Sequence, residues 1–80
     1  MELYQKYKEL RKKLQYNQRQ MGQLFGISRV TVWRIDNGIA DTLNKYVMQI
    51  ELMHSDETYL MARIALAKLP IPHSLYKSHE

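Results

Sequence analysis

The sequence predicts an all-α protein, a compact bundle of about five short helices that contains a helix-turn-helix. Apolar residues recur at intervals of three and four along most of the chain, which is the spacing of one helix face, and no stretch alternates apolar and polar residues as a strand does. Asn, Ser, Gly and Pro, which are typical of helix ends, separate the apolar segments. The 80 residues are enough for one domain with a modest core.

The first helix is expected over residues 3–14 and the second from residue 18. The first has one apolar face, formed by Leu3, Tyr7, Leu10 and Leu14. A turn over residues 15–17 follows, and Asn17 is a favourable N-cap that forms a capping box with Gln20. The second helix has Met21, Leu24 and Phe25 on its apolar face. Gly26 ends this helix, because glycine readily adopts the left-handed conformation found after helix C-termini.

The third helix is expected to begin after the N-cap Ser28 and to reach about Asn37, where Gly38 ends it. At 100° per residue, Val32 and Ile35 fall with Thr31 on one arc, which we expect to face the core. The opposite arc carries Arg29, Val30, Trp33, Arg34 and Asn37. An ordinary solvent-exposed helix has Glu and Lys on this arc rather than Trp and Val, so the outer face of the third helix is the candidate binding surface.

The fourth helix is expected over residues 42–54 and the fifth from residue 56 to about residue 69. The apolar side of the fourth comprises Leu43, Val47, Ile50 and Met53. Ser55 is the expected N-cap of the fifth, and the two acidic residues that follow it suit the positive end of the helix dipole. Pro70 and Pro72 prevent the fifth helix from continuing.

The fifth helix predicts a homodimer. Between residues 59 and 69 only Arg63 and Lys68 are charged, whereas a helix packed on one domain needs a single apolar stripe. A second buried face is therefore expected, and a twofold dimer is the commonest way to cover it. The candidate interface residues are Tyr46, Tyr59, Met61 and Leu66. Residues 1–69 form the predicted helix-turn-helix domain with its dimerisation helix, and residues 70–80 a tail whose Leu75 and Tyr76 either dock on the partner or are disordered.

The charge of the chain favours a polyanionic partner. The net charge is +4, and it is concentrated in the first half. Residues 1–45 contain nine Lys or Arg and four Asp or Glu, a net charge of +5, whereas residues 46–80 contain three and four, a net charge of −1. A basic module joined to a nearly neutral one is typical of nucleic-acid binding with a second function.

The composition also excludes several classes of protein. The chain has no cysteine and no apolar run near the roughly 20 residues of a membrane span, and its first ten residues are polar. We therefore expect a cytoplasmic protein without a membrane partner. The histidines lack the spacing of metal ligands, and the serines and histidines form no catalytic arrangement. We expect no metal, no cofactor and no enzymatic activity.

The segment from Leu10 to Gly38 resembles the Xre family of helix-turn-helix proteins, which includes the phage repressors and Cro-like regulators. The resemblance has no gaps and covers more than a third of the chain. The residues that match the family pattern are Gln18 at the start of the second helix, the small Gly22 at its middle, the turn glycine Gly26, and Ser28 before the recognition helix. Trp33 departs from the pattern, because the family usually has a smaller or more polar residue there.

The resemblance implies a role for each part of the motif. It places base contacts at Arg29, Val30, Trp33 and Arg34, side chains that suit guanine, adenine or the thymine methyl group in the major groove. Residues expected to contact the DNA backbone are Gln18, Arg19, Ser28, Thr31 and Asn37. Arg11 and Asp36 match a structural ion pair of the family.

We therefore expect a sequence-specific regulator that binds double-stranded DNA, most simply a dimeric repressor reading an inverted repeat. Its size and the resemblance imply a phage or mobile-element protein, such as a Cro-like regulator, an immunity repressor fragment or an anti-CRISPR-associated autorepressor. The alternative is an antitoxin or another protein-interaction module with the same fold, in which the fifth helix covers a protein partner. A structural adaptor that does not bind DNA is a third reading.

Overall fold

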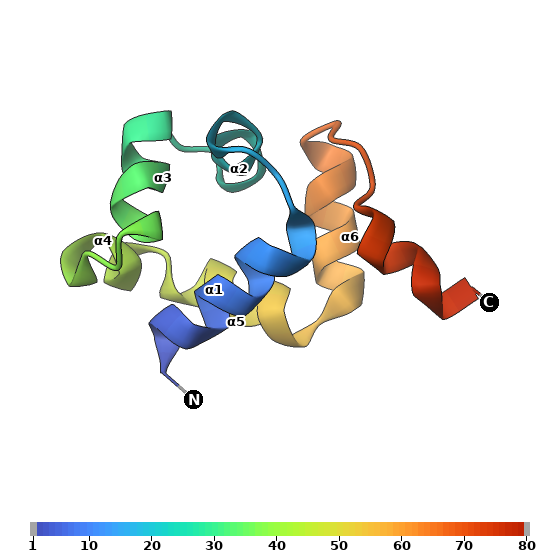
Figure 1. The fold of residues 1–80 in the computed structure, drawn as a ribbon, viewed down its shortest axis with the longest axis horizontal. Coiled ribbons are helices and arrows are strands. Elements are labelled where there is room, and N and C mark those ends of the chain that lie inside the picture. The colour runs from blue at the N-terminus through green and yellow to red at the C-terminus, as the bar shows by residue number, and fades with distance from the viewer. Residues whose placement is uncertain (1, 80) are drawn as a thin grey trace.

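The computed structural model describes residues 2–79 and the side chains of residues 2–76, and this part of the chain is helical with no strand (Figure 1). Its elements, in chain order, are α1 (Leu3–Leu14), α2 (Gln18–Phe25), α3 (Arg29–Asp36), α4 (Ala40–Lys45), α5 (Val47–Ser55), α6 (Glu57–Leu66) and a 3₁₀ helix η1 (His73–His79). The predicted fold class is confirmed. The predicted number of helices differs, because the segment expected to form the fourth helix forms two.

The ends of the first three helices are those that the sequence predicts. The Asn17 side chain accepts a hydrogen bond from the Gln20 backbone N–H at 2.8 Å, and the Gln20 side chain accepts one from the Asn17 N–H at 3.1 Å. Ser28 accepts a hydrogen bond from the Thr31 backbone N–H at 3.2 Å. Gly26 has a φ of 73°, which is the left-handed conformation expected after the C-terminus of α2.

One hydrophobic core joins all the helices. α1 packs against α5, α2 against α3, and α5 against α6. The side chains at its centre come from α1, α2, α3, α5 and α6: Tyr7, Leu10, Met21, Leu24, Val32, Ile35, Ile50, Met53, Leu60 and Ile64. The core covers the inner sides of α2 and α3, which lie next to each other in the upper left of Figure 1, and leaves Arg19 and Arg29 on their outer sides exposed.

The expectation of one helix over residues 42–54 is wrong. The chain breaks at Tyr46, whose φ of −119° and ψ of 24° lie outside the helical region, and α4 and α5 are separate helices. The Tyr46 ring packs edge-on against Phe25, with 6.4 Å between the ring centroids. Val47, expected on the core side, is 37% exposed. Burial of the Tyr46 ring against α2 thus accompanies a break that helical periodicity alone does not reveal.

Both ends of α6 also differ from the prediction. The N-cap is Asp56, whose side chain accepts from the Tyr59 N–H at 3.2 Å, and Ser55 is the last residue of α5 with its hydroxyl donating to the Glu51 carbonyl. The helix ends at Leu66 rather than near residue 69. Lys68 adopts a φ of 57°, the left-handed conformation found after helix C-termini, and the N–H groups of Lys68 and Leu69 donate back to the Ala65 and Ile64 carbonyls.

The segment predicted to be a tail packs on the domain. Leu75 is buried in the core of its own chain, and Pro72 is buried as well. The Tyr16 hydroxyl donates to the Pro70 carbonyl at 2.5 Å, and the Ser74 hydroxyl donates to the Lys13 carbonyl at 2.7 Å. Leu75 therefore contributes to folding of the single chain, while Tyr76 remains exposed.

No helix within residues 2–79 combines the length and the apolar character that crossing a membrane requires.

Candidate nucleic-acid interface

The outer face of α3 carries large apolar side chains between two arginines. Val32 and Ile35 are buried beneath the helix, whereas Val30 is 65% exposed and Trp33 is 52% exposed. Arg29 and Arg34 are exposed on the same side as these two. This division between the two sides of α3 is the one predicted from the helical angles. Exposed Val and Trp on a short helix are unusual in a surface without a partner, so this face is the strongest candidate for a binding surface.

Two adjoining grooves border this face. The larger has a volume of about 480 Å³ and is lined by Gln18, Arg29, Val30 and Trp33. The second has a volume of about 390 Å³, and its lining comprises Asn17, Gln18, Arg19 and Arg29. Gln18 and Arg29 belong to both, so the N-terminus of α2 and the exposed face of α3 form one continuous concave surface. Predicted base-contacting and backbone-contacting residues are brought together in it.

The charge of this surface is positive. Arg19, Arg29 and Arg34 are exposed, and the structure gives them no ion pair among residues 2–76. Elsewhere, some cations pair with carboxylates, as Lys6 does with Glu51, whose Nζ and Oε2 atoms are 3.4 Å apart, whereas others, such as Lys12 and Lys45, form no ion pair among residues 2–76. Arginines that have no internal partner are suited to binding phosphates and base edges.

A partly buried carboxylate, that of Asp36, connects α1, α2 and α3. Arg11 Nε lies 3.1 Å from Asp36 Oδ1, which is the ion pair that the sequence predicts between these residues. Asp36 also accepts a hydrogen bond from the Tyr7 hydroxyl at 2.5 Å and one from the Gln18 side-chain amide at 3.2 Å. Arg11 donates further to the Tyr16 carbonyl. The network therefore fixes Gln18 at the start of α2, one of the residues that line both grooves.

The pKa values of two members reflect this environment. Burial by itself raises the pKa of Asp36, but hydrogen bonds from Tyr7, Arg11 and Gln18 and the positive charge of Arg11 together lower it below the ordinary value. Burial, together with the hydrogen bond to Asp36, raises the pKa of the Tyr7 hydroxyl. Asp36 is thus held as a carboxylate and Tyr7 as a neutral donor.

The turn between α2 and α3 depends on a glycine. A Cβ atom on Gly22 would lie 2.7 Å from the carbonyl oxygen of Ile27, closer than real contacts allow. Gly22 also accepts hydrogen bonds at its carbonyl from the N–H groups of Gly26 and Ile27. The small residue that the motif has at this position is thus required by the backbone of the turn.

Three polar residues predicted to contact the DNA backbone have structural roles at the ends of α3. The hydroxyl oxygens of Ser28 and Thr31 lie 3.0 Å apart, and Ser28 is the N-cap. The Asn37 side-chain amide donates to the Trp33 carbonyl at 2.8 Å. All three side chains keep some access to solvent, where their remaining hydrogen-bonding capacity is available.

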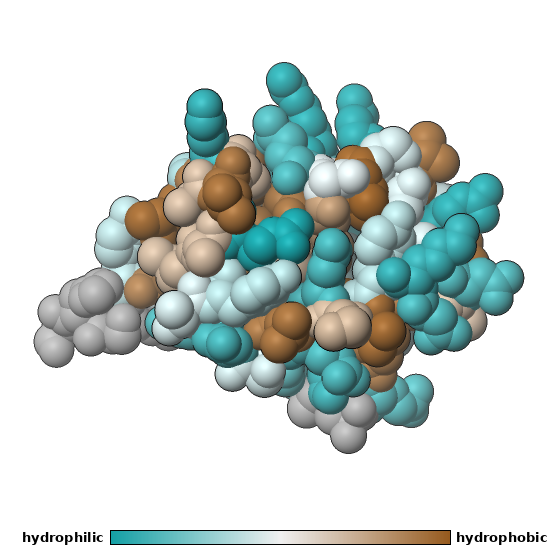
Figure 2. Space-filling view, turned by 180° about the vertical axis from the view of Figure 1, so that it is seen from behind, coloured by the Kyte–Doolittle hydropathy of each residue, from teal (hydrophilic) through white to brown (hydrophobic). Residues whose placement is uncertain are grey.

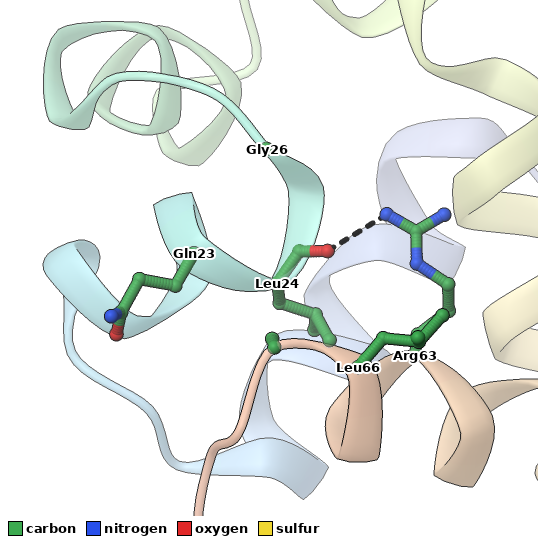
Figure 3. Close-up of a pocket in the computed structure, with 6 residues that line it drawn as sticks. Gln23, Leu24, Gly26, Arg63 and Leu66 are labelled. Carbon is green, nitrogen blue, oxygen red and sulfur yellow. Dashed lines mark hydrogen bonds between the residues drawn. The ribbon is translucent and has the colours of Figure 1, made fainter.

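Sequence reasoning missed the role of Arg63, which it treated only as one charge on an apolar helix. Figure 3 shows this side chain reaching from α6 to the end of α2, where Arg63 Nη2 donates to the Leu24 carbonyl at 2.9 Å. Its Nη1 donates to the Tyr59 hydroxyl at 3.0 Å. A C-terminal carbonyl of α2 has no partner within its own helix, so Arg63 satisfies it and ties α6 to the helix-turn-helix.

The four candidate interface residues differ in their surroundings. Tyr46, Tyr59 and Met61 are partly buried and pack against the core of their own chain. Leu66 is 78% exposed and lines a groove of about 270 Å³ at the end of α2. In Figure 2, seen from behind, hydrophobic surface lies over the region of α6. Leu66 is therefore the member of this set with most of its apolar surface available.

Comparisons with protein-family models, with curated proteins and with solved structures found no match. Among the side chains of residues 2–76, no group of three or more His, Cys, Asp or Glu is arranged to hold a metal ion.

Proposed function

We propose that this chain is a sequence-specific DNA-binding regulator that inserts α3 into the major groove. The observation that carries the proposal is the outer face of α3, where exposed Val30 and Trp33 lie between two arginines that form no ion pair among residues 2–76. The width of the major groove of B-DNA admits one α-helix, and its base edges offer acceptors for Arg and methyl groups for apolar side chains. The resemblance to Xre-type regulators over residues 10–38 supports the same mode of binding.

The N-terminus of α2 supplies the second part of the proposed interface. Gln18 and Arg19 border the groove beside Arg29, and the backbone N–H groups at a helix N-terminus favour anions. In this arrangement Gln18 and Arg19 bind the phosphates of one strand and fix the position of α3, while Arg29 and Arg34 contact base edges. Asp36 acts as a positioning residue because it accepts a hydrogen bond from Gln18, and Arg11 holds Asp36 by its own hydrogen bond to that carboxylate.

We propose further that the protein is cytoplasmic and acts as a homodimer. It represses transcription by occupying a promoter. Exposed Leu66 on α6 supports a second buried face. Two copies of α3 related by a twofold axis would enter successive major grooves about 34 Å apart. The preferred operator is then an inverted repeat. A phage or mobile-element regulator of the Cro-like or anti-CRISPR-associated type fits this size and mechanism.

Selection of duplexes from a randomised DNA pool tests the proposal. We expect enrichment of an inverted repeat with half-sites about one helical turn apart. The double variant Arg29→Ala/Arg34→Ala is expected to lose this enrichment while remaining folded, because both side chains are exposed. The matched control is Lys45→Ala, which removes an exposed cation on α4 and should retain the selected sequence. Failure to enrich any sequence, even at low salt, would rule the proposal out.

A second candidate function is a protein-interaction module of the antitoxin type. The same exposed surface of α6 supports it, because that surface suits a protein partner as well as a second copy. Co-purification with the product of a neighbouring gene separates the two functions. A stable complex that contains one copy of this chain and buries Leu66 favours the antitoxin type, whereas a complex of two copies of this chain favours the homodimeric regulator.

A further inference from the structure

We infer that the groove beside Trp33 binds the 5-methyl group of a pyrimidine, so that recognition by α3 depends on thymine methyl groups. The inference rests on the proposed function and specifies what its binding surface reads. The groove of about 480 Å³ is lined by two apolar side chains, Val30 and Trp33, and by two polar ones, Gln18 and Arg29. Both apolar side chains are more than half exposed.

The chemistry of the walls selects the occupant. Val30 has no hydrogen-bonding group, and the only polar atom of the Trp33 side chain is its indole N–H donor. A base edge rich in donors or acceptors would lose water against these walls without gaining hydrogen bonds in return. The thymine 5-methyl is the apolar group that an unmodified base pair presents in the major groove. The apolar walls therefore favour a thymine at the base pair that they contact.

The two polar lining residues position the DNA around this contact. Gln18 is held by its hydrogen bond to Asp36, and Arg29 has no ion pair among the described residues. Because Arg29 is the residue next to Val30, a phosphate or guanine bound by Arg29 lies close to the base pair that faces Val30. The position of the methyl group is thus set by the same surface that binds the backbone.

Replacing thymine by deoxyuridine tests this inference, since uracil lacks only the 5-methyl group. Each thymine of a selected duplex is replaced in turn, and the Kd is measured by fluorescence anisotropy. We expect a roughly 4-fold weaker Kd for each methyl group that enters the groove, equivalent to about 0.8 kcal/mol, and no change at the other thymines. Replacing the same thymine–adenine pair by a 5-methylcytosine–guanine pair should leave a tighter complex than replacing it by a cytosine–guanine pair.

The variant Val30→Ala assigns the effect to the groove. Val30 is exposed, so this variant is expected to fold and to bind the thymine and deoxyuridine duplexes with similar Kd values. A wild-type protein that binds all deoxyuridine duplexes as tightly as the thymine duplex would overturn the inference and leave the proposed function intact. A protein that binds no duplex would overturn both.

Discussion

At the scale of single residues, the side chain of Asp36 forms the largest set of hydrogen bonds next to the proposed interface. It accepts hydrogen bonds from Tyr7, Arg11 and Gln18, which come from two other helices. The Arg11 and Asp36 side chains are each mostly shielded from water, with exposures of 24% and 20%, so loss of one partner leaves the other poorly solvated. Asp36 therefore links the stability of the fold to the position of Gln18.

Substitution of Asp36 by Asn should lower the free energy of unfolding at pH 7 by about 1–3 kcal/mol. The pKa of Asp36 is lowered in the folded protein, so the stabilisation by its charge is complete above the unfolded pKa of about 3.9 and is lost as the pH falls through the lower folded pKa. Urea unfolding at several pH values measures the difference between wild type and variant.

We expect the difference in the free energy of unfolding between wild type and Asp36→Asn to be constant between about pH 7 and pH 5 and to narrow below about pH 4. The control is Asp41→Asn, which removes an exposed carboxylate on α4 and should leave the free energy of unfolding within about 0.5 kcal/mol of wild type. A gap between wild type and the Asp36 variant that persists unchanged below pH 4 would contradict the assigned role of the charge.

At the scale of elements, the angle between α2 and α3 depends on the close approach at Gly22. Glycine in a helix costs about 1 kcal/mol relative to alanine, so its presence mid-helix needs a structural reason. That reason is the Ile27 carbonyl oxygen, which would lie only 2.7 Å from a Cβ atom at residue 22. A side chain at this position must therefore displace the turn that positions the start of α3.

Substitution of Gly22 by Val should destabilise the protein by about 2 kcal/mol, because the added atoms meet backbone that has little room to move. Thermal unfolding of the variant measures the loss. Gln23→Val is the matched control: residue 23 is exposed on the same helix, so only helix propensity changes, by about 0.5 kcal/mol. Equal stability of the two variants would show that the turn accommodates a side chain at residue 22.

The elements that the sequence predicted correctly are those whose signals are local. Asn17, Ser28 and Gly26 act within one turn of their own helix, so their hydrogen bonds or backbone conformation follow from residue type and position. The buried and exposed sides of α3 follow from the angular spacing of its residues in the same way. For the candidate site, this was enough to predict which side chains of α3 face outward.

The features that were not predicted depend on contacts between distant residues. The break at Tyr46 accompanies packing on Phe25, and Leu75 is buried although the segment around it contains two prolines and no helical pattern. Arg63 bonds to Leu24, 39 residues earlier in the chain. Local patterns contain no information about such partners, so the role of Arg63 at the end of α2 became visible only in the folded chain.

At the scale of the whole molecule, the two proposed binding surfaces belong to different helices. The face of α3 carries arginines and is suited to DNA, whereas the exposed part of α6 around Leu66 is apolar and is suited to a second copy. Arg63 connects the two, because it lies on α6 and donates to the end of α2. In the proposed dimer, this contact would help to set the separation of the two α3 helices, on which recognition of an inverted repeat depends.

Leu66→Glu should convert the proposed dimer to a monomer without unfolding it, because Leu66 is 78% exposed within its own chain and a glutamate there remains solvated only when no partner covers it. Sedimentation velocity measures the change in mass, and circular dichroism checks the helical content. The matched control is Val30→Glu, which places the same charge at another exposed apolar residue. It should keep the dimer and lose DNA binding, while Leu66→Glu should bind a single half-site but lose its preference for the inverted repeat.

A wild-type protein that sediments as a monomer both alone and on the selected duplex would contradict the dimer. If Leu66→Glu instead remained dimeric, the interface would have to lie on another surface.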